Sequence, residues 1–100
     1  MAEKAGFALR WRQAALADLE EIFEFVALDN PAAAGRLAST LRAQVNRLRL
    51  NPRLGRSGRV AGIRELVVPR VPYIVAYQVR GRRIEILAVV HTSRLWPTGF

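Results

Sequence analysis

Residues 59–97 read RVAGIRELVVPRVPYIVAYQVRGRRIEILAVVHTSRLWP, and this stretch decides the fold. It holds three apolar segments, at 63–68, 73–79 and 83–91, separated by a proline-bounded break and by an Arg-Gly-Arg turn. Such segments between turn signals predict three successive β-strands. The last two are apolar at nearly every position, which is typical of central strands covered on both faces. The stretch therefore predicts a β-hairpin that carries the core.

The first half of the chain predicts one strand and two helices. Residues 7–12 alternate apolar and polar side chains, as a short strand does, whereas residues 14–28 place leucines and other apolar residues at helical spacing. Asn30 and Pro31 fit the N-cap and first position of a second helix, which we expect to run to about residue 50. Residues 51–62 are expected to form a glycine-rich loop.

These segments together predict an α+β fold with the order β-α-α-β-β-β. A short break between amphipathic helices favours an antiparallel helical hairpin. We expect this hairpin and the N-terminal strand to pack on a small antiparallel or mixed sheet. At 100 residues the chain is expected to be a single domain, spanning 1–100.

The amino-acid composition indicates the compartment in which the protein is expected to work. The chain has no cysteine, which fits the reducing cytoplasm and provides no thiolate metal ligand. No apolar run reaches the roughly 18 to 20 residues that span a bilayer. The first residues also lack the apolar core of a signal peptide. We therefore expect a soluble cytoplasmic protein without a membrane partner.

Charge is distributed unevenly along the chain. Residues 1–50 have seven basic and six acidic side chains, whereas residues 51–100 have nine and two, so the second half supplies about +7 of the formal net charge of +8. Fifteen of the sixteen basic residues are arginine, whose planar fork grips phosphate or carboxylate with two hydrogen bonds. The pattern indicates an anionic partner: RNA, DNA or an acidic protein chain.

The same distribution argues against a metal or phosphate-loop enzyme. Six of the eight acidic residues precede Pro31, and the basic half has only Glu65 and Glu85, whereas a two-metal nuclease needs several converging carboxylates. The GxxxxGK[ST] phosphate loop is absent. We expect no metal and no cofactor.

His91 is the only histidine, at the end of the last predicted strand. Strict alternation along that strand would place it on the same face as Glu85, Leu87 and Val89. Its imidazole titrates near neutrality, so it could act as a general acid or base beside phosphate-binding arginines. Alternatively, its ring nitrogens bond a loop carbonyl and end the strand.

Arg64 is a charge among apolar neighbours near the start of a strand. On an open face it would stabilise a phosphate or a transition-state charge. It could instead pair with Glu65, Glu85 or another carboxylate and close a structural network. The residues alone leave both interpretations open.

Four further residues are candidates for contacting a target. Arg56 and Arg59 lie in the glycine-rich loop, where they are either solvated charges or follow a phosphate backbone. Arg70, in the break between two strands, is a candidate of the same kind. Trp96 either packs on the core or stacks on a base.

Seven motifs make the chain resemble the RelE/ParE superfamily, the toxins of type II toxin–antitoxin pairs. They are ADLEEI (17–22), DNPAAA (29–34), NP with GRSGRV (51–52 and 55–60), RELVV (64–68), PYIVAY (72–77), IEILAVVH (84–91) and RLWP (94–97). The resemblance implies the RelE/ParE-like fold and a protein that arrests bacterial growth. It also implies neutralisation by a cognate acidic antitoxin in a hetero-oligomeric complex.

The superfamily contains two activities on one fold. RelE-like members cut messenger RNA on the ribosome without a metal, and the resemblance then implies catalytic roles for Arg64, His91 and Arg94. ParE-like members poison DNA gyrase and are not nucleases. This sequence has arginines where the nucleases have loop lysines, and Trp96 near the place of their terminal tyrosine, so it favours the ParE-like side. A non-toxic basic module that binds nucleic acid is the alternative from another class.

Overall fold

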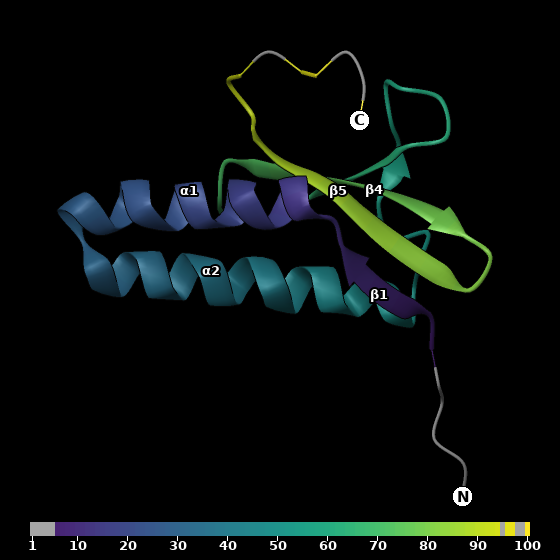
Figure 1. Ribbon diagram of the computed structural model, residues 1–100, viewed down its shortest axis with the longest axis horizontal. Coiled ribbons are helices and arrows are strands. Elements are labelled where there is room, and N and C mark those ends of the chain that lie inside the picture. Colours follow the sequence, from purple (N-terminus) through teal and green to yellow (C-terminus); the bar gives the residue numbers. More distant parts are fainter. Residues whose placement is uncertain (1–5, 95, 98–99) are drawn as a thin grey trace, which may run out of the picture.

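The computed structural model describes residues 6–94, 96–97 and 100, and it has the predicted α+β architecture (Figure 1). Along the chain the elements are β1 (Ala8–Trp11), α1 (Gln13–Asp29), α2 (Pro31–Asn46), the 3-10 turn η1 (Arg47–Arg49), β2 (Arg56–Ser57), β3 (Arg64–Val67), β4 (Tyr73–Arg80) and β5 (Arg83–His91). No helix in these described stretches is both long and apolar enough to cross a membrane.

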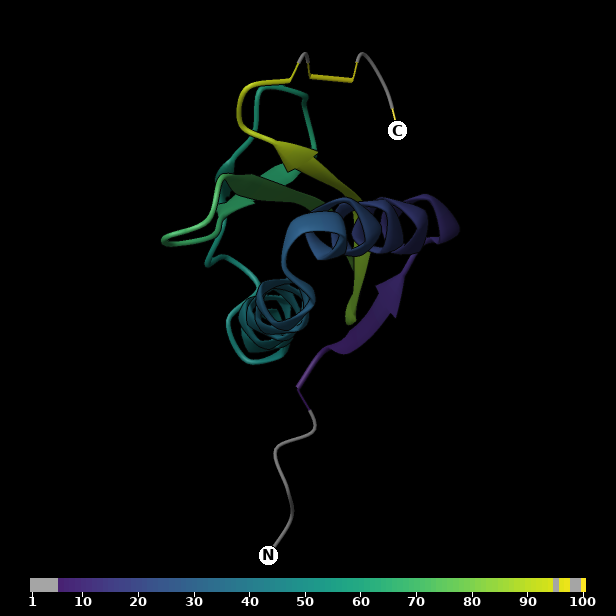
Figure 2. The same cartoon turned by 90° about the vertical axis from the view of Figure 1, so that its left-hand side faces the viewer.

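The two helices lie side by side as an antiparallel hairpin (Figures 1 and 2). The Asn30 side chain accepts a hydrogen bond from the Ala33 N–H at 3.1 Å, and Pro31 takes the first helical position, which confirms the predicted restart. α2 ends at Asn46 rather than near residue 50. The chain then tightens into η1, which keeps Leu48 buried in the core.

The sheet has five strands in the order β1-β5-β4-β3-β2. β1 runs parallel to β5 and the other neighbours are antiparallel, so the sheet is mixed and β4 and β5 are internal, as predicted. The prediction that 51–62 is only a loop was wrong, because Arg56 and Ser57 pair with Glu65 and Arg64 as β2. Two residues leave no readable alternation in a sequence, and only the neighbouring strand defines this pairing.

The sheet has an inner face, toward the helices, and an outer face, away from them (Figure 2). Members of the inner core come from both helices and the sheet: Ala15, Leu19, Leu41, Val45, Leu48, Leu66, Val75, Tyr77, Ile84, Ile86 and Val89 are among them. The outer face has a smaller apolar cluster: Ile63, Ala76, Leu87, Ala88 and Val90, against which Val60 and Trp96 pack. Tyr77 is completely buried in this inner core.

A β-bulge interrupts β5. The register pairs Tyr77 with Ile86 but Ala76 with Ala88, which leaves Leu87 as an extra residue on β5. One extra residue reverses the alternation of side chains beyond it. Leu87 and Ala88, although adjacent, therefore both pack on the outer face.

The bulge changes the face on which His91 lies. Val89 packs in the inner core, and His91 follows it two residues later beside α1. Leu87 packs on the outer face, and so does Glu85, because it pairs with Gln78, two residues along β4 from Ala76 of the outer cluster. The prediction that His91 shares a strand face with Glu85 and Leu87 was therefore wrong. Of the three residues named, only Val89 lies on the same face as His91. Strict alternation fails here because the sequence does not mark the bulge.

Candidate functional site

His91 and Arg94 line one cavity of about 250 Å³ between α1 and the ends of β4 and β5. The remaining lining residues are Asp18, Glu21, Ile22, Phe25, Tyr73 and Val89. The acidic side chains come from α1, whereas histidine, tyrosine and arginine come from the sheet and the segment after it. The cavity thus combines titratable groups with an apolar wall.

The ring of His91 is held from two sides. Its Nδ1 accepts a hydrogen bond from the Ser93 N–H at 3.1 Å and lies 2.8 Å from Ser93 Oγ. Its ring also meets Tyr73 edge to face, with centroids 5.2 Å apart. Because Nδ1 accepts from a backbone amide, the neutral ring has its proton on Nε2. The ring nitrogen therefore contacts the backbone amide and the hydroxyl of Ser93, and not the loop carbonyl that the second interpretation of His91 predicted.

Asp18 closes the other side of the same cavity. Its carboxylate accepts a hydrogen bond from the Val89 N–H at 3.0 Å, at a part of β5 that extends beyond the register of β1. Burial raises the pKa of Asp18, and this outweighs the opposing effect of the Val89 hydrogen bond. The side chain thus supplies an acceptor for a strand N–H that would otherwise lack a partner.

Arg64 has a different partner from those predicted. Its Nη1 donates to the backbone carbonyl of Gly55 at 2.6 Å, rather than to either glutamate. The register pairs it with Tyr77, whose hydroxyl donates to the Pro52 carbonyl at 2.7 Å and accepts from the Gly55 N–H at 2.9 Å. Arg64 and Tyr77 together fix the 51–55 loop against the inner face.

Arg64 and His91 are not brought together. Arg64 stands opposite Tyr77, whereas His91 stands opposite Tyr73, four residues farther along β4 and two strands away from β3. At about 3.3 Å per residue and 4.8 Å per strand, their Cα atoms lie about 16 Å apart. Of the three predicted catalytic residues, only His91 and Arg94 share a cavity.

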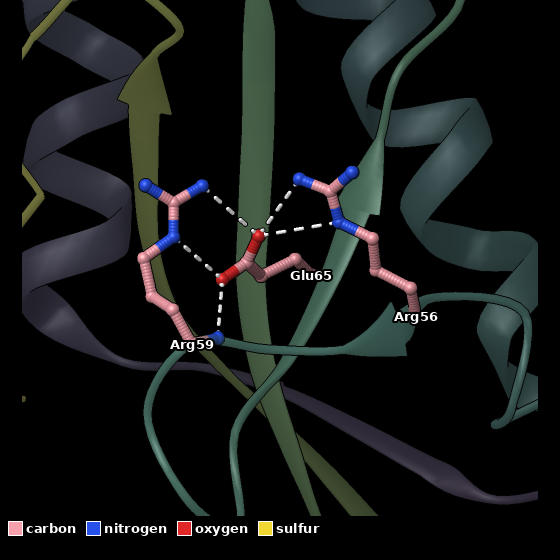
Figure 3. Close-up of polar contacts among 3 residues, drawn as sticks. All are labelled: Arg56, Arg59 and Glu65. Atoms are coloured by element: carbon pink, nitrogen blue, oxygen red, sulfur yellow. Dashed lines mark hydrogen bonds and ion pairs between the residues drawn. The ribbon is translucent and has the colours of Figure 1, made fainter.

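The loop arginines form a closed cluster around Glu65, shown in Figure 3. Arg56 donates from Nε and Nη2 to Oε1 at 3.3 and 3.0 Å. Arg59 donates its backbone N–H and Nε to Oε2, at 2.9 and 3.1 Å, and its Nη2 to Oε1 at 3.3 Å. Burial raises the pKa of Glu65, but the hydrogen bonds from Arg59 and Arg56 outweigh it and lower the pKa to about 2. We call Arg56, Arg59 and Glu65 the Glu65 cluster.

Trp96 extends this cluster. The guanidinium carbon of Arg59 lies 4.1 Å from the centroid of the Trp96 ring, a cation–π contact. Trp96 also packs on the outer apolar cluster. Arg56, Arg59 and Trp96 therefore occupy one surface, whereas Arg70, at a left-handed φ of 70°, lies exposed in the turn after β3.

A second arginine–glutamate cluster was not predicted from the sequence. Glu85 accepts from Arg12 Nη2 at 2.7 Å and Gln78 Nε2 at 3.0 Å through Oε1, and from Arg83 Nε at 3.1 Å through Oε2. The Arg12 hydrogen bond is the largest of the effects that lower the pKa of Glu85 to about 2. We call these four residues the Glu85 cluster. The sequence feature that could have indicated it is Glu85 itself, a single carboxylate between the apolar residues Ile84 and Ile86.

Comparison with known proteins identifies the family. The family described as "ParE toxin of type II toxin-antitoxin system, parDE" matches residues 9–96. The chain belongs to the ParE toxin family. Within the part of this ParE-family toxin that the structure describes, no group of three or more histidine, aspartate or glutamate side chains is arranged so that it could hold a metal ion.

Two curated relatives have similar sequences. The chain is 39% identical over 89 residues to "Putative toxin Y4kP" of Sinorhizobium fredii, covering 89% of this chain and 92% of that protein. It is 36% identical over 85 residues to "Toxin RelE2" of Caulobacter vibrioides, covering 85% and 94%. One of these two relatives has the RelE name, whereas the matching family model has the ParE name.

Two solved structures share the fold. A chain of the chromosomal ParDE system from P. aeruginosa superposes with a TM-score of 0.81 and 29% identity, covering 90% of this chain and all of that one. A chain of the RelBE2 toxin–antitoxin complex from Mycobacterium tuberculosis gives a TM-score of 0.60 at 20% identity, covering 91% and 97%. The second similarity concerns the fold alone.

Proposed function

We propose that this ParE-family toxin arrests growth by acting on DNA gyrase as a binding protein rather than as a nuclease. The separation of Arg64 from His91 supports this proposal. Metal-independent cleavage needs the phosphate-stabilising cation and the proton-transfer group within hydrogen-bond reach of one phosphate. Arg64 donates instead to the Gly55 carbonyl, about 16 Å by Cα from His91.

We also propose that a cognate acidic antitoxin neutralises the toxin. Both structural neighbours come from toxin–antitoxin systems. Two large apolar side chains of α1, Phe25 and Leu28, are 74% and 85% exposed. An antitoxin helix or strand beside the helical hairpin would cover them, and the net charge of +8 would attract acidic residues.

The test uses purified toxin with two targets in parallel. One reaction contains gyrase, ATP and relaxed plasmid, and the other contains ribosomes programmed with a defined message and no metal beyond what the ribosomes require. We expect blocked supercoiling or trapped cleavage complexes in the first and intact message in the second. Message cleaved in the ribosomal A site, with gyrase unaffected, would refute the proposal.

Residue variants sharpen this test in cells. His91→Ala should leave growth arrest largely intact, since a gyrase poison needs no proton transfer from this side chain. Co-expression of the neighbouring reading frame should relieve the arrest. Thermal unfolding of each variant is the control, because toxicity lost together with the fold would mean that the side chain is structural.

A ribosome-dependent endoribonuclease is the second candidate, and the His91 cavity favours it. His91, Arg94 and Tyr73 line that cavity together, so a proton-transfer group and a cation lie close to each other there. In this case His91→Ala and Arg94→Ala should each slow message cleavage by about a hundredfold or more. A third possibility, a non-toxic basic module, would show salt-sensitive binding to naked nucleic acid and no growth arrest.

A further inference from the structure

The outer face of the sheet carries both arginine–glutamate clusters. Glu65 pairs with Ala76 and Glu85 with Gln78, and Ala76 belongs to the outer apolar cluster, so both carboxylates lie on the side away from the helices. These are the only acidic residues among residues 51–100. Each is bound by two arginines, so each cluster has a net charge of +1.

The four arginines are hydrogen-bonded to the two glutamates and still accessible. Their side chains are 57% (Arg56), 50% (Arg59), 44% (Arg12) and 49% (Arg83) exposed, whereas the side chains of Glu65 and Glu85 are 2% and 8% exposed. The carboxylates are therefore beneath the guanidinium groups rather than beside them. An approaching anion would meet cations whose orientation is already set.

We propose that the outer face binds the phosphodiester backbone of the DNA segment on which gyrase acts, and that Glu65 and Glu85 position the arginine forks for it. This rests on the proposed function for the identity of the target. A guanidinium matches a phosphate with two parallel hydrogen bonds. Side chains that are immobilised beforehand lose less conformational entropy when they bind.

The spacing of the clusters suits a regular polyanion. Glu65 and Glu85 are two residues and two strands apart in register, so their Cα atoms are separated by about 12 Å. DNA presents a phosphate for each rise of about 3.4 Å per strand, so the clusters would span three to four phosphates. At one end, the guanidinium of Arg59 also lies over the Trp96 ring, a cation–π contact that helps to fix its orientation.

The first experiment measures binding of the full chain to a fluorescent 20-base-pair duplex from 50 to 300 mM salt. The double variant Arg59→Gln with Arg83→Gln should bind at least about tenfold more weakly at 100 mM salt, with a log–log salt slope shallower by about two. Arg36→Gln with Arg42→Gln, on exposed positions of α2, removes the same charge and is the matched control. Equal loss in both variants would overturn the assignment of the surface.

The second experiment separates positioning from total charge. Glu65→Gln and Glu85→Gln each add one positive charge, so a purely electrostatic surface would bind DNA more tightly. Positioning predicts the opposite, a loss of about threefold to tenfold, because the forks lose their anchor. Unchanged or tighter binding by folded variants would overturn the positioning role. Arg59→Lys with Arg83→Lys keeps the charge and removes the planar guanidinium fork, so it should also weaken binding. This variant tests the positioning role independently if Glu65→Gln or Glu85→Gln does not fold.

Two further readouts separate this inference from the proposed function. If the wild type binds the duplex through these arginines but leaves gyrase unaffected, gyrase is the wrong target and the DNA bound by the outer face is not the segment on which gyrase acts. If Arg59→Gln with Arg83→Gln poisons gyrase as well as the wild type does, the outer face is not the contact. An acidic peptide of equal charge that displaces the duplex at lower concentration would assign the surface to a protein partner instead and overturn the proposal.

Discussion

Replacing Glu65 by glutamine should make the stability of the protein less dependent on pH. The pKa of Glu65 is about 2 in the folded chain and 4.5 as its ordinary value. Because the folded pKa is the lower one, the stabilisation from ionised Glu65 is complete above about pH 5 and is lost as pH falls toward 2. From these two pKa values, ionised Glu65 contributes about 3 kcal/mol to the free energy of unfolding at pH 6 and about 1 kcal/mol at pH 3.

The measurement is urea unfolding of wild type and Glu65→Gln at pH 6, 4.5 and 3, followed by circular dichroism. The difference in free energy of unfolding between the two proteins should shrink by about 2 kcal/mol from pH 6 to pH 3, since glutamine does not titrate. Other carboxylates cancel in this difference. Parallel curves for the two proteins across the range would refute the view that Arg56 and Arg59 hold an ionised Glu65.

Three other substitutions test the structure around the candidate sites. Tyr77→Phe should destabilise the fold by about 2 to 4 kcal/mol, because two backbone groups of the 51–55 loop lose their hydroxyl partner; urea unfolding at pH 7 measures this. Gly58→Ala should destabilise the chain in the same assay, because a Cβ there would lie 2.4 Å from a backbone oxygen; an unchanged midpoint would contradict this contact. Asp18→Asn should stabilise the protein more at pH 7 than at pH 4, because burial raises the pKa of Asp18 and so disfavours its ionised form, while an amide oxygen can still accept from Val89. An equal effect of the substitution at both pH values would show that the carboxylate is not desolvated.

The sequence by itself determined the order of the elements and the central position of the last two strands. Helical spacing in the first half, and the Asn30-Pro31 restart, are local features that require no tertiary contact to be read. The apolar character of residues 73–79 and 83–91 likewise predicts burial on both faces, which β4 and β5 show. The family motifs are also properties of the sequence alone.

Only the tertiary structure decided which charged groups meet. Arg56 and Arg59 lie nine and six residues before Glu65. Their contacts depend on the pairing of β2 with β3, and the two residues of β2 carry no periodicity from which that pairing could be read. The contact of Arg12 with Glu85 joins residues 73 apart, through the parallel pairing of β1 with β5.

The face occupied by His91 was decided in the same way. The bulge at Leu87 moves one residue out of register and so turns every later side chain of β5 to the opposite face. Alternation read from the sequence assumes an unbroken strand, and nothing in the run from Arg83 to His91 marks the extra residue. The position of His91 beside Asp18 and Arg94, and its separation from Arg64, follow from strand register, which is a long-range property of the folded sheet.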